Sequence, residues 1–163
     1  MSRVRGRGFT LIELLIVVAI IGIIVATSIV NFFNAIQRAR QRRSMAEMRG
    51  LSTALEAYAS DHNLYPPPSA YVLPGGLSLP TLTIGVAASY LAPTYLKKAV
   101  LVDGWNSWFL YGTTAENQDY TVVTTGKDGT PETSPPYGIT TAFDNDIILV
   151  DGSFAQFPDG VQQ

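Results

Sequence analysis

Three aspartates near the C-terminal end of the chain have side chains that can bind a metal ion. Asp128 follows one apolar run, and Asp144 and Asp146 come just before another. If these runs are strands, they hold the two ends of the loop and can bring the carboxylates together. Calcium prefers about six to eight oxygen ligands, commonly carboxylates with backbone carbonyls. The spacing does not match an EF-hand loop, so the alternatives are another kind of calcium site and solvated acidic turn residues.

A fourth carboxylate, Glu13, stands at the start of a long apolar run. A lone charge in a bilayer costs about 2.5–3.5 kcal/mol at the centre of a helix and less near its end. One explanation is a glutamate that reaches into the headgroups. The other is a cationic partner, because cleavage after Gly8 would place the new α-amine of Phe9 four residues before Glu13, on the same helix face. At about 4 Å such a pair attracts with roughly 4 kcal/mol before desolvation is counted.

The remaining side chains form no recognisable catalytic pattern. The chain has no cysteine and one histidine, His62, which excludes disulfides, cysteine-based zinc sites and centres with several histidines. It also has no glycine-rich phosphate loop and no nucleophile elbow. We therefore predict that the chain is not an enzyme.

The charges are divided unevenly along the 163 residues. Residues 1–49 carry eight arginines and two acids, whereas residues 50–163 carry three lysines and eleven acids. The basic part coincides with a membrane-like segment, so it does not indicate a surface for nucleic acid. Arginines 38, 40, 42 and 43 are expected either to face water or to meet acidic surface on neighbouring chains.

The segment that must position Glu13 is an uncharged run of 24 residues, 14–37. As a helix it would extend about 36 Å, enough for a hydrocarbon core of about 30 Å. A basic start followed by an apolar stretch is also typical of a secretory signal peptide, for which Ala26-Thr27-Ser28 offers small residues. The apolar character continues beyond them to Ile36, which favours a membrane helix.

The sequence predicts an α+β fold for the segments that must position the three aspartates. The helical pattern continues after the arginines, with one apolar face made by Met48, Leu51, Leu55 and Tyr58. It ends near Asp61-His62-Asn63, before a proline run. After a helical turn at 90–96, strands are predicted at 108–111, 120–125, 147–150 and 153–157. Asp151-Gly152 predicts a hairpin between the last two. We expect a long helix packed on a small antiparallel sheet.

The N-terminal motif resembles a known processing signal. Gly8-Phe9-Thr10-Leu11-Ile12-Glu13 follows a short basic leader and precedes the apolar run. This pattern resembles the class III signal of type IV pilins and pseudopilins. The resemblance implies that prepilin peptidase cleaves after Gly8 and methylates the amine of Phe9. It also implies that Glu13 guides docking of the subunit into a filament.

The rest of the chain carries a narrower resemblance. Its motifs are Tyr95-Leu96-Lys97-Lys98, Asp103-Gly104-Trp105-Asn106, Tyr120-Thr121-Val122-Val123, Asp128-Gly129 and the run from Asp144 to Ile147. Together they are similar to the major pseudopilin of type II secretion systems. In that subfamily the loop between the last strands binds calcium, which replaces the disulfide of many type IV pilins. The resemblance implies Asp128, Asp144 and Asp146 as ligands, with the Thr125 carbonyl as a further candidate.

This resemblance also implies an organisation. Residues 1–8 would be the cleaved basic leader, 9–37 the transmembrane and assembly half of the helix, and 38–163 the soluble head of a pilin fold. The implied topology is a single pass through the inner membrane, with the leader cytoplasmic and the head periplasmic.

The implied function is that of a filament subunit. Copies of the chain would form the periplasmic pseudopilus that drives export of folded proteins, with an inner-membrane assembly platform and minor pseudopilins as partners. One alternative is a type IV pilin, which forms surface fibres for adhesion, motility or DNA uptake. Another is a membrane-anchored binding or enzyme domain that keeps its leader.

Overall fold

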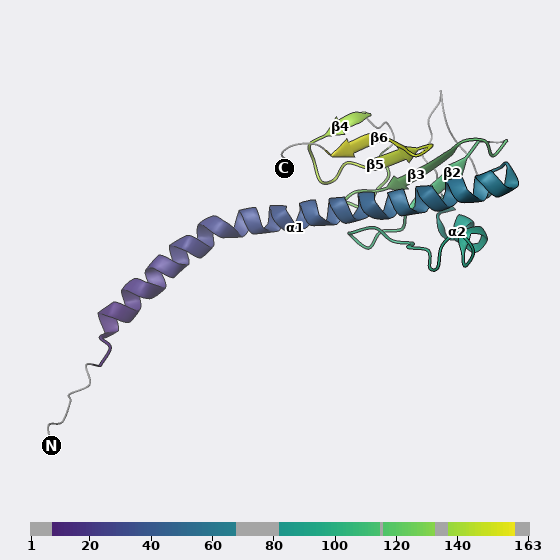
Figure 1. The fold of residues 1–163 in the computed structure, drawn as a ribbon. Coiled ribbons are helices and arrows are strands. Elements are labelled where there is room, and N and C mark those ends of the chain that lie inside the picture. Colours follow the sequence, from purple (N-terminus) through teal and green to yellow (C-terminus); the bar gives the residue numbers. More distant parts are fainter. Residues whose placement is uncertain (1–7, 68–81, 115, 133–136, 159–163) are drawn as a thin grey trace, which may run out of the picture. The chain divides into compact units, whose positions relative to one another are not determined.

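The computed structural model describes residues 8–67, 82–114, 116–132 and 137–158. These residues form two helices and six strands, and Figure 1 shows how the labelled elements are arranged. They are α1 (Leu11–His62), β1 (Leu82–Thr83), α2 (Gly85–Leu91), β2 (Leu110–Thr113), β3 (Tyr120–Thr124), β4 (Gly138–Thr140), β5 (Ile147–Val150) and β6 (Ser153–Pro158). The chain divides into two compact units, residues 1–36 and 37–163. We call the second unit the head.

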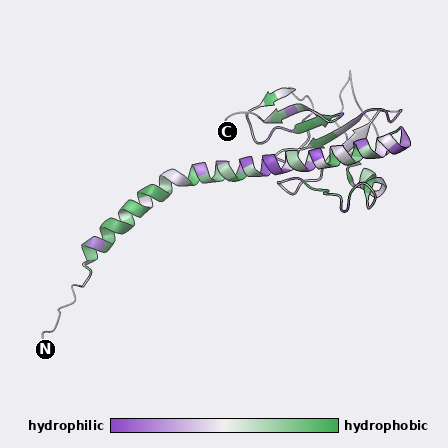
Figure 2. Ribbon diagram, viewed as in Figure 1, coloured by the Kyte–Doolittle hydropathy of each residue, from purple (hydrophilic) through white to green (hydrophobic). Residues whose placement is uncertain are grey.

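In the first unit, residues 11–36 form the N-terminal part of α1. This part is hydrophobic over most of its length (Figure 2), and α1 is long and apolar enough to cross a membrane. Its large apolar side chains are exposed on all faces, Leu11 at 80% and Ile23 at 67%. A helix that is apolar all round must be covered by lipid or by other apolar helices.

In the head, the C-terminal part of α1 packs on the sheet. The predicted stripe is confirmed, because Met48, Leu51 and Leu55 are buried in one core with residues of β2, β3 and β5. Tyr58 is partly buried against the same core. Helix α1 ends at His62, as the sequence predicts.

The sheet has the strand order β1-β2-β3-β5-β6-β4. The predicted α+β class is confirmed, but the sheet has two more strands than predicted and is not wholly antiparallel, since β4 runs parallel to β6. Strands β1 and β4 have two and three residues, too short to show an alternating pattern. The first predicted strand begins two residues late, at Leu110, and Trp108 forms only an isolated bridge with Val102.

The helical turn expected at 90–96 has the wrong bounds, because the helix there, α2, begins earlier, at Gly85, and ends at Leu91. Ala92 is extended, with φ −92° and ψ 143°. The reason is Pro93, because the ring of a proline disfavours helical backbone in the residue before it.

The connection between α2 and β2 is fastened to β3 through Asp103 and to α1 through Gly104. This buried carboxylate accepts hydrogen bonds from two backbone N–H groups of its own loop and from the Thr124 hydroxyl. Next to it, the Gly104 N–H donates to Ser44 Oγ at 2.9 Å. A Cβ at Gly104 would collide with the Arg40 carbonyl oxygen, so the close approach to α1 requires glycine.

Candidate functional site

Glu13 closes a reciprocal cap at the start of α1. Its Oε2 accepts hydrogen bonds from the Thr10 N–H at 2.8 Å and the Thr10 hydroxyl at 2.7 Å. The Glu13 N–H in turn donates to Thr10 Oγ1 at 3.3 Å. This is the capping box, in which the residue before the helix and the third helical residue satisfy each other's free N–H groups. The sequence carries the signal of this cap, Thr-x-x-Glu before an apolar run, which sequence reasoning missed.

The predicted cleavage site lies just before this cap. Gly8 and Phe9 precede the first residue of α1, and both are exposed, Phe9 at 79%. A peptide bond outside a helix is accessible to a peptidase because its backbone groups are not held in the hydrogen-bond ladder. Phe9 and Glu13 lie on either side of Thr10, close to one helix terminus.

Asp128 and Asp144 lie at opposite ends of the C-terminal loop. Asp128 is exposed and caps its own turn, since its Oδ1 accepts the Thr130 N–H at 3.0 Å and its Oδ2 accepts the Thr130 hydroxyl at 2.6 Å. Asp144 is also exposed, with one carboxylate oxygen 3.8 Å from Lys127 Nζ. An exposed ion pair of this length contributes little to stability.

Asp146, in contrast, is fully buried. Its Oδ2 accepts the Glu132 N–H at 2.9 Å, but its Oδ1 has no hydrogen-bond partner. Burial raises the pKa of the Asp146 carboxyl to about 7, the nearby carboxylates of Glu132 and Asp128 add to the rise, and the Glu132 N–H opposes it. The buried hydroxyl of Thr125 also lacks a partner. A buried carboxylate oxygen without a partner calls for a proton or a cation.

The loop is held in place by two residues for which the sequence analysis predicted no role, Gln156 and Glu132. Gln156 of β6 is buried, and its Nε2 donates to Glu132 Oε2 at 2.8 Å and to the Asp146 carbonyl at 2.9 Å. The other oxygen of Glu132 accepts Asn145 Nδ2 at 2.6 Å. The Tyr137 N–H donates to Gln156 Oε1 at 3.1 Å. The sequence gives no signal for this network, because its members lie on separate segments.

Within the described residues, no three acidic, histidine or cysteine side chains form a ready cluster for a metal ion. The structure does bring Asp128 and Glu132 within electrostatic range of Asp146. Asp144 pairs instead with Lys127. His62 is exposed, and its ring stacks on that of Tyr58 with centroids 4.1 Å apart.

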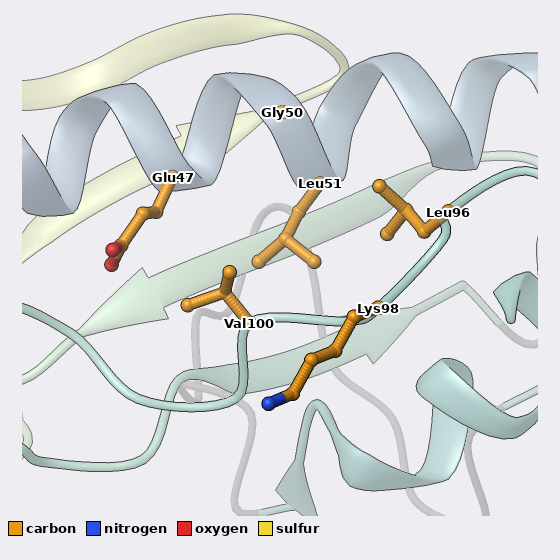
Figure 3. Close-up of a pocket in the computed structure, with 6 residues that line it drawn as sticks. All are labelled: Glu47, Gly50, Leu51, Leu96, Lys98 and Val100. Atoms are coloured by element: carbon orange, nitrogen blue, oxygen red, sulfur yellow. The ribbon is translucent and has the colours of Figure 1, made fainter.

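A small pocket lies on another side of the head, between α1 and the loop after α2 (Figure 3). Leu51 of α1 and Leu96 and Val100 of the loop form its apolar walls, with Glu47 and Lys98 beside them. Its volume is about 100 Å³, well below the roughly 300–1,000 Å³ of typical small-molecule sites.

The chain matches two known protein families. Residues 3–29 match the prokaryotic N-terminal methylation motif, which contains the capping box and the apolar part of α1. Residues 31–140 match the family described as "Type II secretion system (T2SS), protein G". No solved structure matches the chain significantly.

Individual proteins support both matches. The type II secretion system core protein G of Escherichia coli is 28% identical over 125 residues, which are 77% of this chain and 84% of that protein. Its counterpart in Pectobacterium carotovorum is 26% identical over 84% of this chain and 86% of that protein. The type IV major pilin PilA of Myxococcus xanthus is 46% identical, but over only 37% of this chain and 28% of that protein. The chain therefore belongs to the type II secretion system protein G family.

Proposed function

We propose that this chain is a structural subunit of the pseudopilus, the filament of a type II secretion system, and that it works mechanically and not as an enzyme. The observation that carries the proposal is the family match over residues 31–140, in the head as well as α1. The type IV pilin alternative has weaker support, since PilA aligns over 37% of the chain. Growth of a filament of such subunits, seated on an inner-membrane platform and completed by minor pseudopilins, would push folded proteins outward.

The apolar part of α1 supports a route from membrane to filament. Residues 9–37 would hold the new chain in the inner membrane, with the leader in the cytoplasm and the head in the periplasm. Removal of residues 1–8 by prepilin peptidase would create an α-amine on Phe9, next to the Thr10–Glu13 cap. The ionised Glu13 carboxylate would then have a cationic partner at the terminus of its own or a neighbouring helix.

The intact mass of the chain extracted from membranes tests this processing. We expect a mass that lacks residues 1–8 and carries one added methyl group on Phe9. Replacing Gly8 by glutamate should leave the full-length mass, because a bulky charged residue would stand at the scissile bond. The unprocessed mass in the wild-type strain would contradict the proposal and favour an anchor that is never cut.

We also propose that the C-terminal loop binds calcium. The buried, unpartnered Oδ1 of Asp146 and the negative charges of Asp128 and Glu132 around it support a divalent cation. Asp128 and Asp146 would supply carboxylate oxygens, and the Thr125 carbonyl is a further candidate. Asp144 would have to exchange Lys127 for the ion. A bound calcium would neutralise the repulsion among these carboxylates and tie the two ends of the loop together.

Thermal unfolding of the detergent-solubilised chain, with calcium or with excess chelator, tests the site. At a calcium concentration about 100 times the Kd, binding stabilises the folded state by about 2.7 kcal/mol, which raises Tm by on the order of 10 °C. Asp146→Asn should remove most of this rise in Tm. Asp151→Asn, at the other end of β5, should keep it. Magnesium is the ion control. The same Tm in calcium and in chelator would contradict the site.

A further inference from the structure

One exposed face of α1 in the head carries a basic groove. Its lining residues, spaced three, one and three apart, are Arg42, Met45, Ala46 and Arg49. The groove has a volume of about 380 Å³, with a mainly apolar floor between the two arginines. The Arg49 guanidinium lies over the ring of Phe154, 5.3 Å from its centroid. We call this surface the arginine groove.

Further along the head, three exposed acids form a cluster of opposite charge. Glu56 of α1 is close to the β5–β6 turn, where a Cβ on Gly152 would lie 3.7 Å from Glu56 Oε1. Asp151 belongs to that turn, and Asp119 precedes β3. Burial raises the pKa of Asp151, the Tyr120 N–H opposes the rise, and the charges of Asp119 and Glu56 add to it. Asp119 and Glu56 therefore each repel Asp151 within one chain.

The groove and the acidic cluster lie on the same stripe of α1. Glu56 is 7 residues beyond Arg49 and 14 beyond Arg42, which is close to two and four complete turns. The corresponding rise is about 10 and 21 Å. Among the described residues, Arg42, Arg49 and Glu56 form no ion pair with another side chain. A second copy with a parallel helix, rotated by half a turn about the helix axis and shifted along it by about 10 or about 21 Å, would bring its Glu56 opposite Arg49 or Arg42 of the first.

We propose that the arginine groove is the docking surface for the cluster of Glu56, Asp119 and Asp151 on a second copy of this chain. The inference rests on the proposed filament and specifies one contact between heads within it. The opposite charges fix the register of neighbouring subunits, and the apolar floor excludes water around the arginine stems. The uneven distribution of charge along the sequence then has a structural role.

Charge reversal tests the contact, with the polymerised fraction measured by sedimentation of filaments. Arg42→Glu with Arg49→Glu would place like charges against the acidic cluster, and we expect at least a tenfold loss of polymer. Adding Glu56→Arg and Asp119→Arg should restore it, because attraction returns with the signs exchanged. The matched control is Lys97→Glu with Lys98→Glu, which changes the charge equally outside the groove and should polymerise normally.

Co-expression of two single-cysteine chains identifies the contacting surfaces, and the absence of native cysteine makes the result clean. Ala46→Cys lies in the groove, and Gln118→Cys lies beside Asp119. A short bifunctional maleimide should join them into a heterodimer in filaments. Filaments of the two cysteine chains that form in wild-type amounts but give no heterodimer, or undiminished polymer after arginine reversal, would overturn the contact. A wild-type chain that forms no filament would instead overturn the proposed function.

Discussion

Replacing Glu13 by alanine is expected to abolish filament formation while the head stays folded. The substitution removes the carboxylate from the capping box, so the Thr10 N–H and hydroxyl at the start of α1 lose their acceptor. It also leaves the α-amine of processed Phe9 without an anionic partner among apolar helices, so a charge there is left uncompensated. Sedimentation of filaments measures the loss of assembly, and tryptophan fluorescence of Trp105 and Trp108 reports on the head.

Two further variants separate the cap from the charge. Thr10→Ala removes the hydroxyl of the cap but keeps the carboxylate, so assembly should continue with a frayed helix start. Glu13→Gln keeps an oxygen that can accept the Thr10 N–H but loses the charge, so assembly should fail. Wild-type amounts of filament from Glu13→Ala would contradict both the docking role and the ion pair.

The second large effect is expected at Gly126, which begins the turn before Asp128. Gly126 has φ +61°, and a Cβ there would lie 2.5 Å from the Asp144 carbonyl oxygen and 2.7 Å from that of Asn145. Gly126→Ala therefore combines left-handed backbone strain of about 1–2 kcal/mol with overpacking of about 1–3 kcal/mol. Urea denaturation should show a loss of about 2–5 kcal/mol, a large part of a typical domain's stability.

Gly138→Ala provides the matched control. Gly138 has φ +86°, but no atom lies within 4 Å of a Cβ built on it. Gly138→Ala introduces only the backbone strain, so the free energy of unfolding should fall by only about 1–2 kcal/mol. Equal losses at the two positions would show that the approach of residues 144 and 145 to Gly126 does not constrain the loop.

Features governed by local pattern were predictable from the sequence. The apolar run predicts the exposed helix, and the spacing of Met48, Leu51 and Leu55 predicts the buried face. The β5–β6 hairpin forms at Asp151 and Gly152, with φ of 44° and 78°. Two consecutive positive φ values are what a two-residue hairpin of this kind needs. Each of these features depends on residues that are near one another in the chain.

Features that depend on contacts between distant parts of the chain were not predictable from the sequence. The parallel pairing of β4 with β6 depends on the path of the chain between β3 and β5. The spacing of apolar residues in the sequence does not predict that path. The burial of Asp146 depends on Glu132 and Gln156, which approach from either side of it in sequence. The sequence suggests only that the three aspartates converge at one loop, whereas packing buries Asp146 and leaves Asp128 and Asp144 exposed. That difference decides which carboxylate has an unpartnered oxygen.

The most direct test of a pseudopilus subunit compares proteins in the culture supernatant of a strain that lacks the gene with those of its parent. We predict the selective loss of exported proteins, restored by the wild-type chain and not by Glu13→Ala. An unchanged supernatant would contradict the secretion role. In that case the loss of surface fibres from the same strain would establish the type IV pilin alternative.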